Sequence, residues 1–298
     1  MSFKPMPCSD RWNGLLTILV LGLLDLTLIH QVMNRPIDGL SFLLGLSAVA
    51  IPFLMVYIAY RTLGAFTMEY WVDRDAVTVV WGLTRHIVPL THIEQILTDS
   101  ALQPQQGPRF WHWPCPFRRR VHCGRLGIVN AYATQPFHEQ LVLVTAEESY
   151  GLSPADRAGF VAALQERYAL GAARPVRPEL RRPPIWTWPL WRDRTALFLI
   201  AAGLFGVVLM FGVLSFLYPV LSADLPLHFD VSGLPDRIAP KANLFGLPVI
   251  GLVTWLFNTV VGIWLYRRVQ HGAAYLLWGG ALIVQGIAGL ALFNLMRW

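Results

Sequence analysis

A short polar segment, residues 225–241, carries side chains that could bind a ligand. Alternate side chains of an extended chain share a face, so His228 and Asp230 would point the same way. Asp236 and Arg237 add charges of both signs. This set favours either the recognition of a peptide or other ligand, or a cap whose charges pair with one another. Metal-assisted hydrolysis is disfavoured because no third ligand or general base accompanies the histidine and the aspartate.

Residues 109–125 form a second candidate site, with five arginines, four aromatic residues and no acid. Arginine pairs with lipid phosphate and tryptophan sits at the headgroup level, so this segment predicts contact with anionic lipid. A solvated loop and a partner-protein site are the alternatives. Two histidines and two cysteines also lie here, but their irregular spacing disfavours zinc, and no metal or cofactor is predicted. The residues expected to contact lipid or a partner are Arg109, Trp111, Trp113, Arg118, Arg119, Arg120 and Arg125.

Three polar residues, Asp25, Asn258 and Gln285, fall inside long apolar segments. An ionisable group near the middle of a bilayer is costly and is a functional candidate by default. One interpretation is hydrogen bonding between helices, with Asp25 protonated. The other is ion or proton conduction. The absence of a basic partner at the depth of Asp25 favours the first interpretation.

The chain lacks the sequence motifs of common enzymes. It has no phosphate-binding P-loop, no Gly-x-Ser-x-Gly, no His-Glu-x-x-His and no dinucleotide fingerprint, so no enzymatic activity is predicted. The three cysteines, Cys8, Cys115 and Cys123, are an odd number and fall in regions that we place in the cytoplasm, which predicts free thiols.

The composition indicates a membrane protein. Hydrophobic residues make up 55% of the chain and charged residues 14%, against about 25% charged residues in a soluble domain. A helix needs about 20 apolar residues to span a bilayer. The segments that qualify are roughly 12–33, 40–60, 195–218, 245–266 and 273–296. Prolines prevent a continuous helix through residues 221–244, so we expect a polar loop there at the membrane surface.

Basic residues predict the orientation of these spans. Lysines and arginines cluster at one side of every span, which places the N-terminus and the middle region in the cytoplasm. The outer loop and the C-terminus then lie outside the inner membrane. Trp186, Trp188 and Trp191 suit an interfacial aromatic belt before the third span.

The middle region, residues 61–171, has a different pattern. Apolar and polar residues alternate over short runs separated by turn residues, which predicts a β meander. Ser153 is a predicted N-cap for a helix that ends at Gly171. The fold class is therefore an α-helical membrane protein of about five transmembrane helices, with an inserted, mainly β domain closed by a C-terminal helix. The expected strands are 66–71, 76–80, 86–90, 127–134 and 140–145.

Two stretches resemble known families. Trp71-Val-Asp-Arg-Asp75, Val79-Val-Trp-Gly82 and Tyr150-Gly-Leu-Ser-Pro-Ala-Asp156 resemble the bacterial variety of pleckstrin-homology (PH) domain. Leu225-Pro-Leu-His-Phe-Asp230 with Gly233-Leu-Pro-Asp236 resembles a domain of unknown function that also occurs in immunity proteins against secreted killing peptides. Neither resemblance supplies a catalytic residue, and neither implies phosphoinositide binding.

These observations predict the domain organisation and a function. We expect two transmembrane helices in 1–60, a PH-like domain in 61–171, a Pro/Arg/Trp-rich linker in 172–194, and three transmembrane helices in 195–298. The predicted function is a non-enzymatic scaffold or sensor that contacts anionic lipid and an unidentified protein or peptide, with no nucleic acid. The alternative is a transporter or toxin-immunity protein that uses the outer loop and Asp25.

Overall fold

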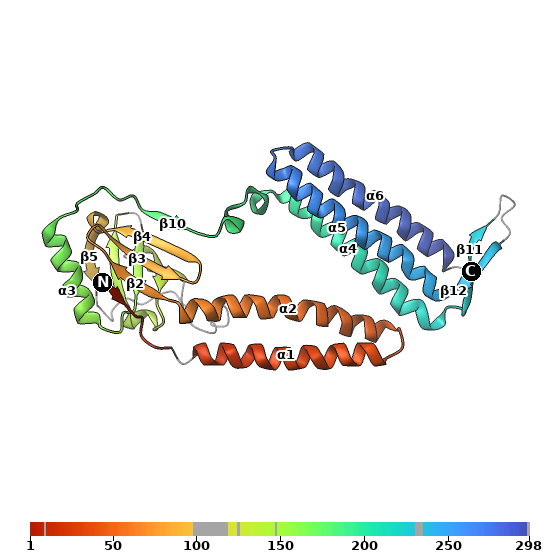
Figure 1. Cartoon of the computed structure of the whole chain (residues 1–298), viewed down its shortest axis with the longest axis horizontal. Coiled ribbons are helices and arrows are strands. Elements are labelled where there is room, and N and C mark those ends of the chain that lie inside the picture. Colours follow the sequence, from red (N-terminus) through yellow and green to blue (C-terminus); the bar gives the residue numbers. More distant parts are fainter. Residues whose placement is uncertain (9, 98–118, 124–125, 147, 230–234, 297–298) are drawn as a thin grey trace. The chain divides into compact units, whose positions relative to one another are not determined.

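The computed structural model describes residues 1–8, 10–97, 119–123, 126–146, 148–229 and 235–296 (Figure 1). Among these residues, five helices are long and apolar enough to cross a membrane, as the sequence predicts. These helices are α1 (Asp10–Asn34), α2 (Gly39–Phe66), α4 (Arg194–Leu217), α5 (Gly246–Arg267) and α6 (His271–Leu295). The chain divides into two compact units, which are described separately: Met1–Leu24 with Ile51–Pro184, and Asp25–Ala50 with Ile185–Trp298.

The first unit contains a β domain, whose first sheet has the strand order β1-β2-β3-β4-β10 and is antiparallel throughout. Its central strands follow the predicted alternation of apolar and polar residues, whereas the two edge strands were not predicted. Helix α2 also continues past its predicted end and stops three residues before β2. The strands are β1 (Ser2–Phe3), β2 (Glu69–Val72), β3 (Ala76–Trp81), β4 (Thr84–Pro89) and β10 (Glu179–Arg181).

The second sheet of the β domain has the order β5-β8-β9-β7-β6. Strands β7 and β9 pair in parallel, and the other neighbours pair antiparallel. Residues 119–123, which we expected within a loop, form the edge strand β6. The strands are β5 (Ile93–Leu97), β6 (Arg119–Cys123), β7 (Gly127–Tyr132), β8 (Leu141–Thr145) and β9 (Ser149–Leu152).

A single long helix, α3 (Arg157–Leu170), closes the β domain. Its cap is Asp156, whose side chain accepts a hydrogen bond from the Gly159 amide at 2.9 Å, so the prediction of Ser153 as the N-cap is wrong. The helix ends at Gly171, as predicted, with a φ of 72° that glycine adopts without a steric penalty. Phe160 is completely buried and joins α3 to the apolar core of the domain.

The second unit contains a bundle of α4, α5 and α6, which lie side by side in Figure 1. Glycines allow the helices to approach closely, because large side chains of one helix pack directly on the backbone of another. A Cβ atom at Gly262 of α5 would lie 2.2 Å from Nε1 of Trp278 on α6. On the other side of the bundle, Trp255 of α5 packs on Gly203 of α4 and donates a hydrogen bond to the Ile200 carbonyl at 2.9 Å. Close helix contacts at glycines therefore help to hold the bundle, together with large buried side chains such as Trp278 and Leu214.

Candidate functional site

The predicted polar loop between α4 and α5 is a β-hairpin. Strand β11 (Asp224–Phe229) pairs antiparallel with β12 (Pro235–Pro240), and His228 is registered opposite Arg237. Asp230 lies outside the described residues, and the structure does not describe the side chains of His228, Asp236 and Arg237. Whether these four side chains recognise a ligand therefore stays a prediction.

The base of this hairpin is anchored to the bundle. Leu225 is 2% exposed and packs in an apolar cluster with Leu214, Leu244 and Leu292. A hairpin of two strands is marginally stable by itself in water. Burial of Leu225 against α4 and α6 therefore fixes the base of the hairpin where the spans end.

Lys241 reinforces the anchor. Its ammonium group donates hydrogen bonds to the carbonyl oxygens of Tyr218, at 2.8 Å, and Leu221, at 3.0 Å. It also lies 4.5 Å from the centre of the Tyr218 ring. The last carbonyls of a helix lack intrahelical partners and carry partial negative charge, so a cation there satisfies them. Lys241 therefore links the start of α5 to the end of α4.

The three polar residues predicted inside the membrane have different surroundings. Asn258 donates a hydrogen bond from α5 to the Leu277 carbonyl of α6 at 3.0 Å, which is the predicted bond between helices. Gln285 is 5% exposed, and neither its amide nitrogen nor its oxygen has a hydrogen-bond partner among the described residues. One carboxylate oxygen of Asp25 is also buried without such a partner. A Cβ at Gly206 would lie 2.5 Å from the Gln285 oxygen, so glycine provides the space for this amide.

Asp193, which was not among the predicted site residues, accepts several hydrogen bonds at the end of the bundle where α4 begins. One of its oxygens accepts a hydrogen bond from the Ala196 amide at 3.0 Å and caps α4. The other accepts from the hydroxyl of Tyr266, at 3.0 Å, and from the hydroxyl of Tyr275. The bond from Tyr275, followed by the amide bond from Ala196, lowers the pKa of Asp193 below its ordinary value. An aspartate directly before an apolar run is an N-cap signal that could have identified this residue.

A buried polar network fastens the N-terminal segment to the β domain. The Tyr70 hydroxyl donates to the Tyr132 carbonyl at 2.7 Å and accepts from the Ser153 amide at 3.2 Å. The Ser153 hydroxyl accepts from the Thr134 amide at 2.8 Å, and the Thr134 hydroxyl donates to the Met6 carbonyl at 2.6 Å. Burial raises the pKa of Tyr70 to about 12, so the phenol stays neutral and can donate. These bonds link the N-terminal segment to β2 and to the residues that follow β7 and β9.

His86 is the buried histidine of the first sheet. Its Nδ1 lies 2.9 Å from the Tyr132 hydroxyl, and the rings of Tyr132 and Tyr150 pack edge-on against its imidazole. All three side chains are buried within the domain. This environment is that of a satisfied core histidine rather than of a solvent-accessible acid or base.

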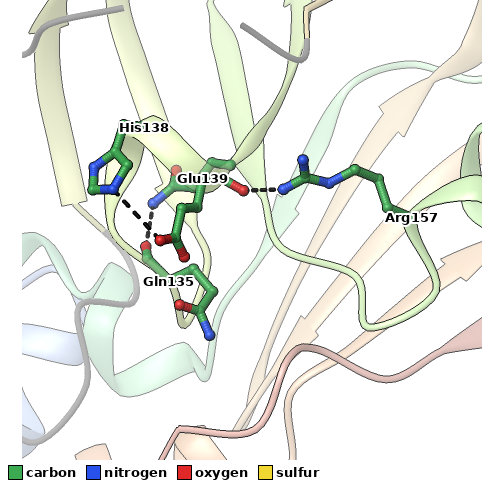
Figure 2. Close-up of polar contacts among 5 residues, drawn as sticks. Gln135, His138, Glu139 and Arg157 are labelled. Atoms are coloured by element: carbon green, nitrogen blue, oxygen red, sulfur yellow. Dashed lines mark hydrogen bonds and ion pairs between the residues drawn. The ribbon is translucent and has the colours of Figure 1, made fainter. Parts of the chain in front are cut away.

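Figure 2 shows a polar cluster on the surface of the β domain, where the turn before β8 meets the start of α3. The imidazole of His138 lies 3.5 Å from the Glu139 carboxylate, and Arg157 donates to the Glu139 carbonyl. The side chain of Gln140 donates to the Gln135 carbonyl at 2.8 Å. His138 and Glu139 are both more than half exposed. The cluster therefore joins two surface segments and does not enclose a reaction site.

Most of the arginine and tryptophan segment predicted to contact lipid lies outside the described residues, namely Arg109, Trp111, Trp113, Arg118 and Arg125. Arg119 and Arg120 lie in β6, where their backbones pair with Ala131 and Asn130. The structure does not describe their side chains, so the predicted lipid contact remains a prediction.

The cysteines differ from one another. Cys123 is free, is 3% exposed and packs with Val129, Phe137 and Val142, and burial raises the pKa of its thiol. Cys8 is disulfide-bonded, so the prediction of free thiols is wrong for this residue. Cys115 lies outside the described residues. Apolar neighbours of Cys123 give it the character of a core residue rather than of a metal ligand.

A groove of about 380 Å³ runs between β5 and α3 in the β domain. Strand β5 is an edge of the second sheet, and the exposed ring of Tyr168 stands at one side of the groove. The groove belongs to the β domain alone, and no residue of a membrane span lines it. Its lining residues are Leu90, Ile93, Glu94, Gln95, Ile96, Leu164, Gln165, Tyr168 and Ala169.

Comparisons with known families confirm both resemblances. Residues 68–168, from the start of β2 to near the end of α3, match the profile of a bacterial PH domain. Residues 205–252, from α4 through the hairpin into α5, match a domain of unknown function, DUF1648. Comparisons with curated proteins and with solved structures gave no match.

Proposed function

For a multi-pass membrane protein that carries a bacterial PH domain, we propose a non-enzymatic role as a sensor or scaffold. In this role the outer hairpin communicates with the PH domain, and the PH domain contacts lipid headgroups and a protein or peptide partner. One observation carries the proposal: both edge strands of the first sheet belong to segments that lead along the chain into membrane helices. Strand β1 precedes α1, and β10 precedes α4.

The N-terminal edge of the sheet is firmly attached. The Met1 ammonium donates to the Val72 carbonyl at 3.0 Å, and the Val72 amide donates to the Met1 carbonyl at 2.8 Å. Further along, the Met6 amide bonds to the Ser153 carbonyl at 2.8 Å. Phe3 packs edge-on against Phe160 in the core, with ring centres 5.2 Å apart. This edge therefore holds the start of α1 close to the PH domain.

The other edge of the sheet, β10, is exposed to solvent, and the segment before it is held where the Ala173 and Arg174 amides donate to the Asp75 carboxylate at 2.6 and 3.2 Å. Strand β10 has three residues, all exposed. It pairs antiparallel with β4, and its central residue Leu180 lies opposite His86. Short segments with few buried apolar contacts open at low free-energy cost. In the proposed role the two edges therefore differ in burial, and β10, which leads along the chain into α4, is the edge that we expect to open first.

The sensor role is tested by perturbing the hairpin and observing the sheet. Lys241→Met removes the bonds that hold the end of α4, while Val220→Ala alters an 80% exposed side chain in the same region. In the full chain in lipid nanodiscs, we expect Lys241→Met to speed amide hydrogen exchange in β4 and β10, and Val220→Ala to leave it unchanged. If exchange speeds up at β11 and β12 but not at β4 and β10, the communication is absent and only the scaffold role stands.

The pairing of β1 with β2 also bears on the orientation of the chain in the membrane. Because β1 pairs with β2, the N-terminal segment and the PH domain share one side of the membrane, and we place that side in the cytoplasm from the arginine distribution. The hairpin and the C-terminus then lie outside the inner membrane. The disulfide at Cys8 opposes this placement, because disulfides persist mainly in oxidising compartments.

Labelling with an impermeant thiol reagent decides the orientation. Ser222 and Ala162 are both exposed, one beside the hairpin and one on α3. In intact cells we expect Ser222→Cys to react and Ala162→Cys to stay unlabelled, relative to the parent chain. The opposite pattern would invert the topology and place the PH domain outside.

A second candidate function, transport or immunity to a secreted peptide, is favoured by Asp25, whose buried carboxylate oxygen lacks a hydrogen-bond partner among the described residues. An unpaired acid within a span is a substrate or proton site by default. Asp25→Asn keeps the side-chain size and removes the charge. Loss of solute uptake or of toxin protection in Asp25→Asn cells, with normal protein levels, would support this function over the scaffold role.

A further inference from the structure

Arginine and tryptophan side chains gather at the end of the α4–α6 bundle where α4 begins. We call this group the arginine–tryptophan collar. It combines the segment before α4 with the last turn of α5 and its C-cap, and all of these residues lie in the second unit. Its members are Trp186, Trp188, Trp191, Arg192, Arg194, Trp264, Arg267 and Arg268.

The segment before α4 is a folded part of the bundle. It forms two short 3-10 turns, Pro184–Thr187 and Pro189–Arg192. Leu190 is 5% exposed and packs against Tyr266 and Trp278, while the Trp191 indole donates to the Ile185 carbonyl at 2.6 Å. The segment is therefore fixed in place as a cover on the end of the helices.

This folded segment nevertheless leaves large apolar side chains exposed. The exposed fractions are 59% for Trp186, 51% for Trp191 and 49% for Ile185. Large rings held outward in water are unfavourable, whereas tryptophan is enriched at the level of lipid headgroups. Trp191 precedes the first residue of α4 by three positions, so these exposed side chains are next along the chain to a candidate membrane span.

The charge of the collar is positive and largely unopposed. Four exposed arginines stand beside one acid, Asp193, in residues 185–194 and 264–275. Asp193 already accepts bonds from Ala196, Tyr266 and Tyr275. The guanidinium of Arg267 lies 5.1 Å from the Trp188 ring, and that of Arg268 lies 4.9 Å from the Trp264 ring. Stacking orients a guanidinium while its in-plane donors remain able to bind phosphate.

We propose that the arginine–tryptophan collar binds anionic phospholipid, with the arginines on the lipid phosphate and the exposed tryptophan rings at the headgroup level. Charge complementarity and continuity with the spans select a lipid over a protein partner. None of the collar residues belongs to 109–125, so this proposal is tested independently of the lipid contact expected there and of the sensor role.

The test compares two variants of equal charge change in the full chain. The collar variant is Arg192→Gln, Arg194→Gln, Arg267→Gln and Arg268→Gln, and the control replaces four exposed arginines of the β domain, Arg74, Arg85, Arg174 and Arg177, by glutamine. Both chains are reconstituted in nanodiscs of phosphatidylcholine with a minor fraction of phosphatidylglycerol. Retention of phosphatidylglycerol after transfer to detergent is then measured by mass spectrometry.

We expect the collar variant to retain at least about tenfold less phosphatidylglycerol than the parent chain, and the control to retain it normally, because basic residues near the surface act cumulatively. If the collar variant retained as much phosphatidylglycerol as the parent chain, the proposal would be overturned. It would also be overturned if retention fell only in a variant with Arg118→Gln, Arg119→Gln and Arg120→Gln. Displacement of the lipid by millimolar inorganic phosphate would show that the collar is a site for free phosphate and not for lipid.

Two further measurements keep the test decisive if the collar variant folds poorly. The parent chain should lose phosphatidylglycerol as salt rises, because exposed charges are screened. Trp186→Ala with Trp191→Ala leaves every charge in place and should lower retention of both lipids. Retention that is independent of salt and of both tryptophans would also overturn the proposal.

Discussion

The PH domain and the α4–α6 bundle differ in how many of their large apolar side chains are exposed. In the PH domain, Tyr70 and Phe160 are completely buried, as expected where water drives apolar groups inward. In the bundle, Phe198 and Phe205 are exposed while Gly203 and Gly262 lie at helix contacts. Lipid tails are as apolar as these side chains, so exposed phenylalanines cost the bundle little, and close helix approach at glycines adds to the burial of side chains such as Trp278. The same kind of substitution should therefore have different consequences in the two regions.

The largest difference should come from truncating a phenylalanine. Phe160→Ala removes a fully buried ring and should lower the free energy of unfolding of the PH domain by about 3–5 kcal/mol. Phe205→Ala, at a ring 66% exposed on α4, should have far less effect on the bundle. Amide hydrogen exchange of the full chain in nanodiscs measures both regions at once. Comparable losses for the two variants would break the contrast.

Adding one methyl group to a glycine tests the close helix contacts of the bundle. Gly262→Ala forces a Cβ against the buried Trp278 and should cost about 1–3 kcal/mol. Gly279→Ala is the matched control, because a Cβ there meets no atom within 4 Å. We expect faster exchange in α5 and α6 for the first variant and no change for the second. Identical behaviour would show that close glycine contacts do not hold the bundle.

A smaller effect is expected for the buried polar network of the PH domain. Tyr70→Phe removes the hydrogen bond to Tyr132 and should cost about 1 kcal/mol at neutral pH.

Tyr70→Phe should also change how the stability of the PH domain depends on pH in alkaline solution. The pKa of Tyr70 is about 12 in the folded protein against 10.0 ordinarily, so the unfolded chain loses this proton first. The stability contribution is full below pH 10 and falls as pH rises toward 12, by at most about 3 kcal/mol. Unfolding measured from pH 9 to 12 should show a shallower decline for Tyr70→Phe. An unchanged slope would show that Tyr70 does not carry the linkage.

The smallest effect near neutral pH is expected at Asp193. Asparagine is also a good N-cap, so Asp193→Asn keeps the cap of α4 and removes chiefly the charge that binds the two tyrosine hydroxyls. The pKa of Asp193 is lowered from 3.8, so its contribution is present above that value and is lost as pH falls through the lower folded pKa. The parent bundle should therefore lose stability in acid more steeply than the variant does. Tyr275→Phe should reproduce part of this change, and parallel acid curves for all three chains would refute the assignment.

Features that depend on local pattern were predictable. The five spans follow from runs of about 20 apolar residues, and β3 and β4 follow from alternation. The short edge strands β1 and β10 have two and three residues, too few to show a period, and their partners are far along the chain. Ser153 has the sequence context of an N-cap, yet its hydroxyl accepts a hydrogen bond from the Thr134 amide. The N-cap of α3 is Asp156, three residues later.

The candidate site was only partly predictable for the same reason. The polar loop was recognised from its prolines and charges, but the anchoring of Lys241 depends on carbonyls 20 and 23 residues away. The cluster at Asp193 depends on Tyr266 and Tyr275, which lie 73 and 82 residues further on. Hydrogen bonds over such separations leave no periodic signal, so only the capping role of Asp193 could be inferred locally.

The pairing of β1 with β2 has a consequence for how the chain is made. Strand β1 is synthesised before α1 and α2, whereas its partner β2 is synthesised only after both helices. If only one of these two helices were inserted, Met1 and Val72 would be on opposite sides of the bilayer and the sheet would lack its edge strand. Pairing of β1 with β2 therefore requires that α1 and α2 be inserted together, and a chain with only one of them inserted would leave an unpaired strand edge of the kind that promotes aggregation.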